Sequence, residues 1–318
     1  MKTIQSNLIL FSVLISLSKF NFSHTYLLPD IAVSETENHI VINIPNVRLY
    51  VYKEKIYDID YPIAVGKGLS QTPVGNYQIG VRAHNPTWYI PLSIQKERKQ
   101  KGLEDVKKIL PGADNPLGPL FIRFGESELG LGIHGTNVPS SVPGIRSHGC
   151  IRMKNEDIIQ LDKKIKKGDF VSITYQLYAL NLDDNNQLWF QKYPNPYKLE
   201  DQNLQQIKTT LNLWEQETGQ LIDKVKLSQA LKKSQPKPIC LTCTQKFPKI
   251  SGKLQSIAWT EGKIEIRATE YSRTMDKMKI DEFLFNPMIK LPQSIWEPKP
   301  QKTVDDLSNS IEKIDNLL

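Results

Sequence analysis

The chain has 318 residues, of which 39% are hydrophobic and 24% charged, and its formal net charge is +7 at pH 7. This composition is typical of a soluble globular protein with room for two domains of ordinary size. No basic stripe with interleaved aromatic residues occurs in the sequence, which argues against nucleic-acid binding. The modest positive charge instead suits a protein that works near anionic polymers.

Residues 1–24 have the pattern of a secretory signal peptide. Lys2 precedes an apolar run at residues 8–17 that is too short to span a bilayer, and polar residues follow from Ser18. No Ala-x-Ala cleavage site is evident, so cleavage between Lys19 and Thr25 and retention as an N-terminal anchor are both open. No cysteine directly follows this apolar run, which excludes a lipoprotein anchor. We therefore expect an exported protein.

The first half of the chain predicts short strands joined by turns. We expect strands within residues 39–52, 61–66, 76–81, 120–124, 131–133 and 170–173. Asn155, followed by Glu156 and Asp157, is expected to cap a helix after Cys150. Residues 83–119 contain five prolines and little periodicity, which favours a lid or binding loop over a surface insertion.

The second half has a different character. Apolar residues at helical spacing over 204–214 and 221–231 predict two amphipathic helices separated by Gly219. A β-hairpin is expected over 257–267, and a short final helix follows a linker at Lys299-Pro300. We expect residues 177–318 to form a C-terminal α+β region.

Reactive side chains cluster between residues 134 and 150. His134-Gly135-Thr136 precedes the run 147–153, SHGCIRM, so two histidines bracket Cys150. A cysteine has to be deprotonated to attack a carbonyl, and a nearby imidazole usually arranges this. The glycines at 135 and 149 would allow positive φ angles and close approach of a substrate. A nucleophilic thiol fits this pattern better than a buried structural cysteine beside chance histidines.

A zinc site is the rival interpretation of His134, His148 and Cys150. Their spacing matches no common zinc pattern and no carboxylate obviously completes the set, so we expect no metal and no cofactor. The other two cysteines, Cys240 and Cys243, are closely spaced. A local disulfide or two free thiols are favoured there over half of a zinc site.

The sequence resembles the L,D-transpeptidase family (the YkuD-type domain), cysteine acyltransferases that remodel bacterial peptidoglycan. The resemblance runs through PNVRLYVY at 45–52, YPIAVG at 61–66, TPVG at 72–75, NPTW at 85–88, LPGADNPLG at 110–118 and the cysteine run. The family often has Leu-Asn after its cysteine, whereas Ile151-Arg152 resembles the Gram-negative envelope branch and leaves the substrate detail open. The resemblance implies a mostly β, sandwich-like catalytic domain at 38–176 with a helix after the catalytic cysteine.

The resemblance also implies roles for the reactive residues. Cys150 would be the nucleophile that attacks the diaminopimelate carbonyl of a tetrapeptide stem and releases D-alanine. His134 would be the general base, oriented by the carbonyl of Gly135, with His148 as the competing assignment for the base. The backbone N–H groups of His148, Gly149 and Cys150 would stabilise the oxyanion.

Five further residues are candidates for substrate binding. Arg152 suits a substrate carboxylate, and a structural ion pair is the alternative. Ser147 is expected to hold the loop by hydrogen bonding. Thr136, Tyr61 and Trp88 are candidates for the wall of the cleft, where simple packing is the alternative.

The expected reaction passes the acyl group to an amine of a second stem, giving a 3–3 cross-link, or to a lysine of an outer-membrane lipoprotein. Hydrolysis of the same acyl-enzyme, giving a carboxypeptidase or amidase, and a non-catalytic peptidoglycan-binding protein are the alternatives. The expected partners are peptidoglycan stem peptides and a lipoprotein acceptor, and the expected location is the periplasm. The C-terminal region is a candidate wall-binding module.

Overall fold

The first half of the chain forms two β-layers that share one long strand. The computed structural model describes residues 26–270. The predicted signal peptide, the linker at Lys299-Pro300 and the final helix lie outside these residues. No helix in this part of the chain is long and apolar enough to cross a membrane.

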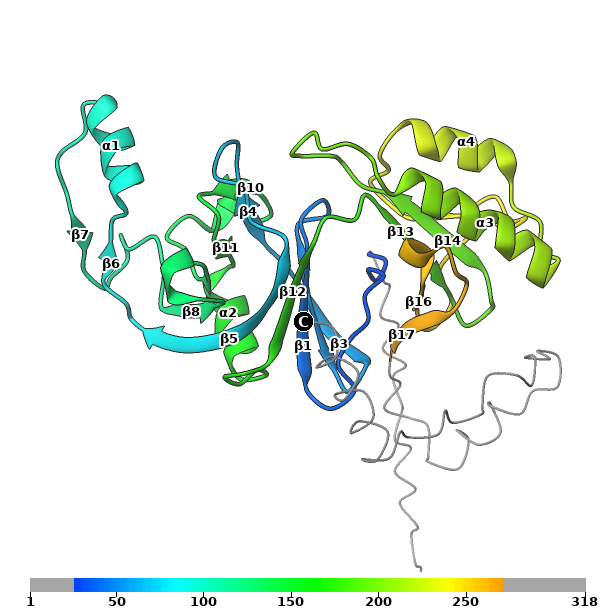
Figure 1. Ribbon diagram of the computed structural model, residues 1–318, viewed down its shortest axis with the longest axis horizontal. Helices are drawn as coiled ribbons and strands as arrows, with labels where there is room; N and C mark the ends of the chain where they lie inside the picture. Colours follow the sequence, from blue (N-terminus) through cyan, green and yellow to red (C-terminus); the bar gives the residue numbers. More distant parts are fainter. Residues whose placement is uncertain (1–25, 271–318) are drawn as a thin grey trace, which may run out of the picture. The chain divides into compact units, whose positions relative to one another are not determined.

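One layer has the strand order β5-β12-β1-β2-β3, and the other has the order β10-β4-β11-β9-β8-β5 (Figure 1). The strands are β1 (Asn38–Asn43), β2 (Arg48–Lys53), β3 (Ile56–Pro62), β4 (Ala64–Gly66), β5 (Gly75–His84), β8 (Leu120–Phe124), β9 (Gly132–His134), β10 (Gly144–Ser147), β11 (Ile151–Arg152) and β12 (Phe170–Thr174).

Strand β5 belongs to both layers. Its first half, up to Gln78, pairs with β12 and its second half, from Ile79, pairs with β8. The register with β8 shifts between Ile79 and Arg82, where the strand passes from one layer to the other. Such an irregularity bends a strand and increases its local twist. The two layers therefore face each other across one core.

The core between the layers is aliphatic. Ile40 and Ile42 from one layer and Ile122, Ile133 and Ile151 from the other are fully buried there. Helix α2 (Asn155–Asp162) adds Ile158 and Leu161 to the same core. Burying a side chain of this size stabilises the fold by roughly 1.5–3 kcal/mol. The predicted β-rich domain with a helix after Cys150 is confirmed.

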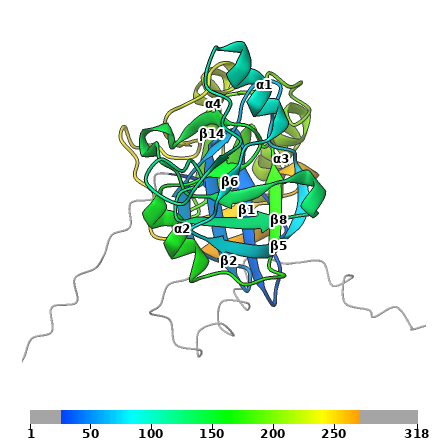
Figure 2. The ribbon, with the colours of Figure 1, turned by 90° about the vertical axis from the view of Figure 1, so that its left-hand side faces the viewer.

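Residues 83–119 contain regular secondary structure, which corrects the expectation of an irregular segment, and their role as a lid or binding loop stays a prediction. They contain a two-stranded sheet of β6 (Trp88–Tyr89) and β7 (Lys108–Ile109), and helix α1 (Leu92–Gln100) lies between these strands in the chain (Figure 1). Figure 2 shows α1 and β6 from the side. Helix α1 has no buried residue. Because it buries no apolar face, the sequence carries no apolar stripe that could predict it.

The C-terminal region is α+β as predicted. Its elements are β13 (Tyr178–Leu182), β14 (Leu188–Lys192), α3 (Leu204–Thr218), α4 (Lys224–Lys232), β15 (Ile239–Cys240), β16 (Gln255–Ile257) and β17 (Ile266–Glu270). Gly219 ends α3 with a φ of 68°, which glycine adopts without strain. Strands β16 and β17 form a hairpin near the predicted place, and β17 pairs with β3 (Figure 1). The connection is longer than predicted, because Trp259–Glu261 forms a short 3-10 helix in place of strand. One hydrogen-bonded sheet thus continues from the first half into the second.

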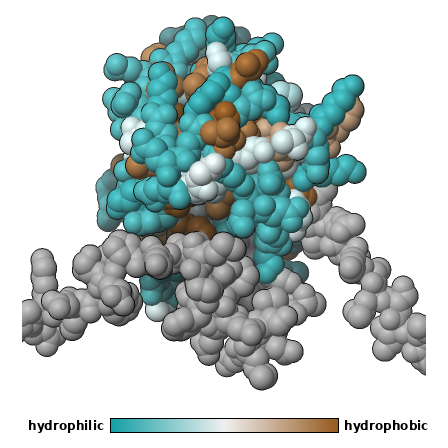
Figure 3. Space-filling view, turned by 90° about the vertical axis from the view of Figure 1, so that its right-hand side faces the viewer, coloured by the Kyte–Doolittle hydropathy of each residue, from teal (hydrophilic) through white to brown (hydrophobic). Residues whose placement is uncertain are grey.

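A second core lies within the C-terminal region. Ile207, Leu211 and Trp214 of α3 pack with Leu180 of β13 and Phe190 of β14. Figure 3 views the right-hand side of Figure 1, and hydrophilic residues predominate there, with hydrophobic ones in small separate patches. Helix α3 therefore turns its apolar stripe inward, as its spacing predicted. The stripe predicted over 221–231 is only partly inward, because α4 buries Ala230 while Leu221 and Val225 are exposed.

A third core joins the two halves of the chain. Leu27 and Leu28, at the start of the described residues, are buried with Tyr50, Tyr52 and Trp189. The side chain of Asn181 fixes this segment, because its Oδ1 accepts from the N–H of Leu28 at 2.7 Å and its Nδ2 donates to the Leu28 carbonyl at 2.9 Å. Residues 26–270 accordingly belong to one compact unit. The boundary at residue 176 stays a prediction.

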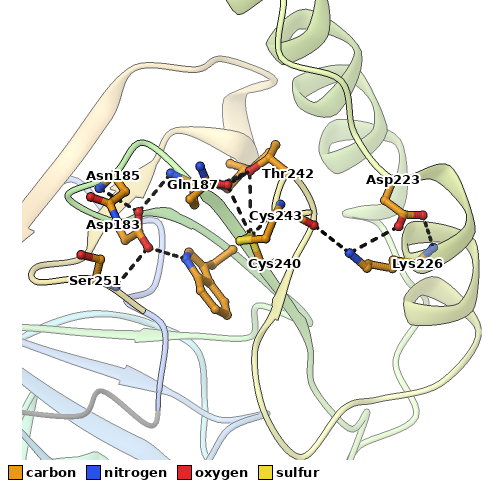
Figure 4. The surroundings of a disulfide bond; sticks show 11 residues. Asp183, Asn185, Gln187, Asp223, Lys226, Cys240, Thr242, Cys243 and Ser251 are labelled. Atoms are coloured by element: carbon orange, nitrogen blue, oxygen red, sulfur yellow. Dashed lines mark hydrogen bonds and ion pairs between the residues drawn. A yellow bond between two sulfur atoms is a disulfide. The ribbon is translucent and has the colours of Figure 1, made fainter. Parts of the chain in front are cut away.

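Cys240 and Cys243 form a disulfide at the end of β15 (Figure 4). Beside it, the Thr242 hydroxyl donates to Gln187 Oε1 at 2.9 Å and accepts from the backbone N–H of Leu188 at the same distance. Lys226 of α4 donates to the Cys243 carbonyl at 3.0 Å. The bridge and these bonds fasten the segment to β14 and α4. Of the two favoured interpretations of this cysteine pair, the structure shows the disulfide.

Candidate functional site

The register of three adjacent strands places the reactive residues on one face of the second layer. Ile122 of β8, Ile133 of β9 and Ile151 of β11 are register partners that point into the core. Because side chains alternate along a strand, His134 and its register partner Arg152 point to the opposite face.

Cys150 directly precedes β11, and continuing the register of β11 with β9 places it opposite Gly132. A hydrogen bond from the Gly132 backbone to the Cys150 sulfur agrees with this placement. Gly132 and His134 are two residues apart on one strand, so they share a face with Cα atoms about 7 Å apart. Cys150 and His134 therefore lie on the same face of the sheet. This is the juxtaposition that the sequence pattern predicted.

The imidazole of His134 is buried and oriented. Its Nδ1 lies 2.7 Å from the Gly135 carbonyl, and its ring stacks on Phe121 with centroids 6.4 Å apart. A carbonyl oxygen can only accept, so Nδ1 carries the proton and Nε2 keeps a lone pair in the neutral ring. A Cβ on Gly132 would lie 2.2 Å from the Phe121 ring, so glycine is needed there to make room for this ring.

Burial, followed by the positive charge of Arg152, lowers the pKa of His134 to about 4. The carbonyls of Gly135 and Pro116 have the opposite effect because they stabilise the protonated ring. Burial raises the pKa of the Cys150 thiol, against the effects of Gly132, Arg123 and Arg152. The resting pair is therefore a neutral thiol and a neutral imidazole at pH 7.

The loop that carries Cys150 is held from inside. The buried Ser147 hydroxyl donates to the Cys150 carbonyl at 2.5 Å and accepts from the Gly149 N–H at 3.2 Å. Gly149 has a φ of 110°, a conformation that favours glycine. Ser147 thus uses its hydroxyl within the loop, and the Gly149 N–H is already engaged. The other two predicted oxyanion donors, the backbone N–H groups of His148 and Cys150, are not bound by the Ser147 hydroxyl.

The side chain of His148 contacts helix α1. It is exposed, and its Nε2 lies 3.1 Å from Glu97 Oε2 of α1. Lys101 and then His148 lower the pKa of Glu97 to about 2. His148 thus connects the cysteine loop to α1, while His134 is the histidine on the face of Cys150. Within residues 26–270, no three His, Cys, Asp or Glu side chains form a group that could hold a metal ion.

Arg152 has a neutral partner. Its Nη1 donates to the Ser141 hydroxyl at 2.9 Å, and no carboxylate of the described chain forms an ion pair with it. Arg146 and Arg152, with Val138, Ser140 and Ser141, line a cavity of about 360 Å³. The structure therefore leaves a positive charge on the site face without an internal counter-ion, in place of the predicted alternative of a structural ion pair.

The three predicted wall residues differ in their surroundings. Tyr61 lies in the core between the layers, and burial raises its pKa to about 12, so its place on the cleft wall is corrected to a packing role. Thr136 is buried, and its hydroxyl accepts from the Val138 N–H at 3.0 Å. Trp88 lies on the partly exposed β6 beside α1.

Asn155 is a site residue that the sequence analysis assigned differently. It was expected to cap α2, but Lys154 occupies the cap and Asn155 is the first helical residue. Its Oδ1 instead accepts from the Thr136 N–H at 2.8 Å. A Cβ on Gly135 would approach this oxygen to 2.4 Å and one on Gly118 to 2.6 Å, so glycines at both positions allow the contact. Asn155 thereby braces the chain just after His134.

Comparisons with known proteins agree on one family. A family profile described as the YkuD L,D-transpeptidase catalytic domain matches residues 37–173. The L,D-transpeptidase homologue YqjB of Bacillus subtilis is 32% identical over 139 residues, which are 43% of this chain and 70% of that protein. The homologue YbiS of Escherichia coli K12 is 29% identical over 231 residues, 70% of this chain and 72% of that protein.

Other matches are partial. The homologue YcfS of Escherichia coli K12 is 34% identical, but the match spans 42% of this chain and 43% of that protein. Among solved structures, the catalytic domain of an Enterococcus faecium L,D-transpeptidase is 19% identical, with a TM-score of 0.34. That match covers 44% of this chain and 98% of the domain.

Proposed function

The chain belongs to the L,D-transpeptidase (YkuD) family, and we propose that it is a cysteine acyltransferase that acts on peptidoglycan stem peptides. The observation that carries this proposal is the register of β9 and β11, which puts Cys150 and the buried His134 on one face of the sheet. Family membership supports the substrate class, because the matched relatives carry the name of this activity.

The proposed reaction has two steps. In the first, the Cys150 sulfur bonds to the diaminopimelate carbonyl carbon, the bond to the terminal D-alanine breaks, and the thiol proton leaves on the D-alanine amine. In the second, an acceptor amine bonds to the same carbonyl carbon, the thioester bond breaks, and the amine proton returns to the sulfur. One imidazole can carry the proton in both steps.

His134 is the proposed base because its geometry suits that role. The Gly135 carbonyl fixes the proton on Nδ1 and leaves Nε2 able to accept. Its pKa of about 4 keeps the ring neutral at pH 7. Since the thiol pKa is raised, we propose that His134 takes the thiol proton as Cys150 attacks, with no resting thiolate–imidazolium pair.

The oxyanion is proposed to bind the backbone N–H of Cys150 with that of His148. The Gly149 N–H, which donates to Ser147, would join them only after the serine hydroxyl moves. Fixed donors of this kind typically contribute roughly 3 kcal/mol each to transition-state stabilisation.

Arg152 is the proposed site for a substrate carboxylate. It lies on the face of His134, and its guanidinium contacts a neutral hydroxyl in a cavity that Arg146 also lines. A planar guanidinium binds a carboxylate with two parallel hydrogen bonds. Diaminopimelate and D-alanine both offer carboxylates, which fits this pocket to the proposed donor.

An exported location is also proposed, with the periplasm or cell envelope as the compartment. The leader-like pattern of residues 1–24 supports it. The Cys240–Cys243 disulfide supports it as well, because disulfides persist in oxidising compartments. The acceptor is proposed to be an amine of a second stem or a lipoprotein lysine.

Mass spectrometry of muropeptides tests this proposal. The protein without residues 1–24 is mixed with tetrapeptide muropeptides, and a Cys150→Ala protein runs in parallel. Cross-linked dimers that vanish with the variant are expected. Tripeptide products alone would mean hydrolysis of the acyl-enzyme. Unchanged muropeptides with both proteins would contradict the proposed enzyme activity and favour a binding role.

A further inference from the structure

A tyrosine of the C-terminal region contacts the chain beside the cysteine loop. Tyr197 lies between β14 and α3, and its hydroxyl donates to the Gly66 carbonyl at 2.9 Å. The same oxygen accepts from the Thr72 N–H at 3.1 Å. One phenol oxygen therefore bridges the two ends of the turn that follows β4.

The same turn is hydrogen-bonded to the cysteine loop. The buried Thr72 hydroxyl accepts from the Gly66 N–H and donates to the Gly149 carbonyl, both at 2.9 Å. Lys67 of the same turn donates its N–H to the Ser147 carbonyl at 3.0 Å. Two carbonyls of the cysteine loop are thus held by a turn whose ends Tyr197 bridges.

Tyr197 is itself held rigidly. Its ring stacks on Tyr175 with centroids 5.4 Å apart, and its N–H donates to the Tyr175 hydroxyl at 2.8 Å. That hydroxyl donates in turn to Asn195 Oδ1 at 2.6 Å. The position of the Tyr197 hydroxyl is accordingly set by Tyr175, at the end of the predicted catalytic domain, and by Asn195 of the C-terminal region.

The Gly149 carbonyl matters for catalysis because of peptide geometry. The carbonyl of Gly149 and the N–H of Cys150 belong to one planar peptide unit and point in opposite directions. Fixing the carbonyl through Thr72 therefore fixes the direction of the Cys150 N–H, which is a proposed oxyanion donor.

We propose that Tyr197 is a positioning residue that acts through Thr72 on the Gly149–Cys150 peptide, so that the C-terminal region completes the active site. This inference rests on the proposed function, since it assigns a role in the acylation of Cys150. It gives the C-terminal region a role in catalysis besides the wall binding expected from the sequence.

A Tyr197→Phe variant of the full chain tests this inference, because it removes both hydroxyl contacts and keeps the stacked ring. Single-turnover acylation by a tetrapeptide stem is followed by intact mass over a range of donor concentrations. We expect the maximal acylation rate constant to fall about tenfold, part of the 10²–10³-fold cost of losing an oxyanion donor. The half-saturating donor concentration should change less than about twofold, and the amplitude should stay complete.

The readouts separate positioning from folding. Loss of folded protein lowers the amplitude of acylation and leaves the rate constant of the remainder unchanged, so that result would overturn the inference. Thr72→Val should lower the rate constant in the same way, while Thr72→Ser, which keeps the hydroxyl, should restore it. Because the two residues act in one chain of contacts, the double variant Tyr197→Phe/Thr72→Val should be no slower than Thr72→Val.

Tyr57→Phe is the matched control. Tyr57 is also half-buried, and its hydroxyl donates to Asp60 at 2.7 Å on β3, so its loss should leave acylation unchanged. A Tyr197→Phe rate constant within twofold of wild type, with the wild type acylated normally, would overturn the inference alone. A wild-type protein that is not acylated would overturn the proposed function and this inference with it.

Discussion

Arg152 is the register partner of His134 in the parallel pair of β11 and β9, and its guanidinium lowers the pKa of that imidazole. Burial is the larger cause of the low pKa, and Arg152 is the second. The residue proposed to bind the substrate carboxylate thus also tunes the proposed base. A bound carboxylate would neutralise Arg152 and make His134 a stronger base when the substrate is in place.

Replacing Arg152 with Gln should therefore raise the pKa of His134 from about 4 towards its ordinary value of 6.5. NMR titration of the histidine ring resonances in the free protein measures this directly. His39 is the internal control, because burial alone lowers its pKa to about 4. An unchanged pKa of His134 in the variant would contradict the electrostatic coupling.

Asn155→Ala should destabilise the segment that follows His134. The substitution leaves the Thr136 N–H without its acceptor, and losing the partner of a buried group typically costs about 1–3 kcal/mol. We expect a lower free energy of unfolding by chemical denaturation, together with slower acylation. Asn155→Asp keeps an acceptor oxygen at the first turn of α2 and is the control. Equal effects of both substitutions would contradict the bracing role.

The reactivity of Cys150 should reflect its raised pKa. Cys150 is the only free cysteine of the three, so iodoacetamide alkylation of the oxidised protein reports on it alone. The thiolate is the reacting form, so the alkylation rate should rise with pH beyond 9 without a plateau near neutral pH. A plateau near pH 7 would instead indicate a resting thiolate–imidazolium pair.

Much of the site could be predicted because its signal is local. His134, His148 and Cys150 lie within seventeen positions of one another. Apolar and polar residues alternate along several of the neighbouring strands, which makes those strands predictable. The stripe of α3 was predictable for the same reason, since this helix buries one apolar face, whereas Val225 of the stripe predicted for α4 is exposed.

The remaining features depend on contacts that no local pattern encodes. Tyr197 meets Gly66 across 131 positions, and Asn155 meets Thr136 across 19. Asparagine is also a common helix-capping residue, so its propensity predicted a bond to the first turn of α2 in place of the observed bond to Thr136. Tyr61 was a candidate for the cleft wall with packing as the alternative, because an aromatic residue suits a cleft and a core equally well, and its burial favours packing.

Acid should destabilise the fold through His39. Its Nδ1 accepts from the Ser34 N–H at 3.1 Å, and its Nε2 lies 2.8 Å from the Ser172 hydroxyl, so the buried ring is neutral. Its folded pKa of about 4 lies below the ordinary 6.5, so the unfolded chain binds a proton that the folded chain does not. The contribution is intact above pH 6.5 and is lost as pH falls towards 4, by at most about 3 kcal/mol.

His39→Gln tests this by denaturation of the full chain at pH 7, 5.5 and 4. The variant should lose less free energy of unfolding than wild type over this range. Some loss should persist, because the folded pKa of His134 is also about 4. A pH dependence identical to that of wild type would contradict the assignment to His39.

Intact-protein mass spectrometry of the acyl-enzyme tests the central claim most directly. Wild-type protein is mixed with a tetrapeptide stem in the absence of an acceptor amine, quenched in acid and digested to locate the adduct. The account predicts an adduct with the mass of the stem minus D-alanine on Cys150, formed at a greatly reduced rate in His134→Ala and absent in Cys150→Ala. No adduct on the wild type, or an adduct on another residue, would contradict it.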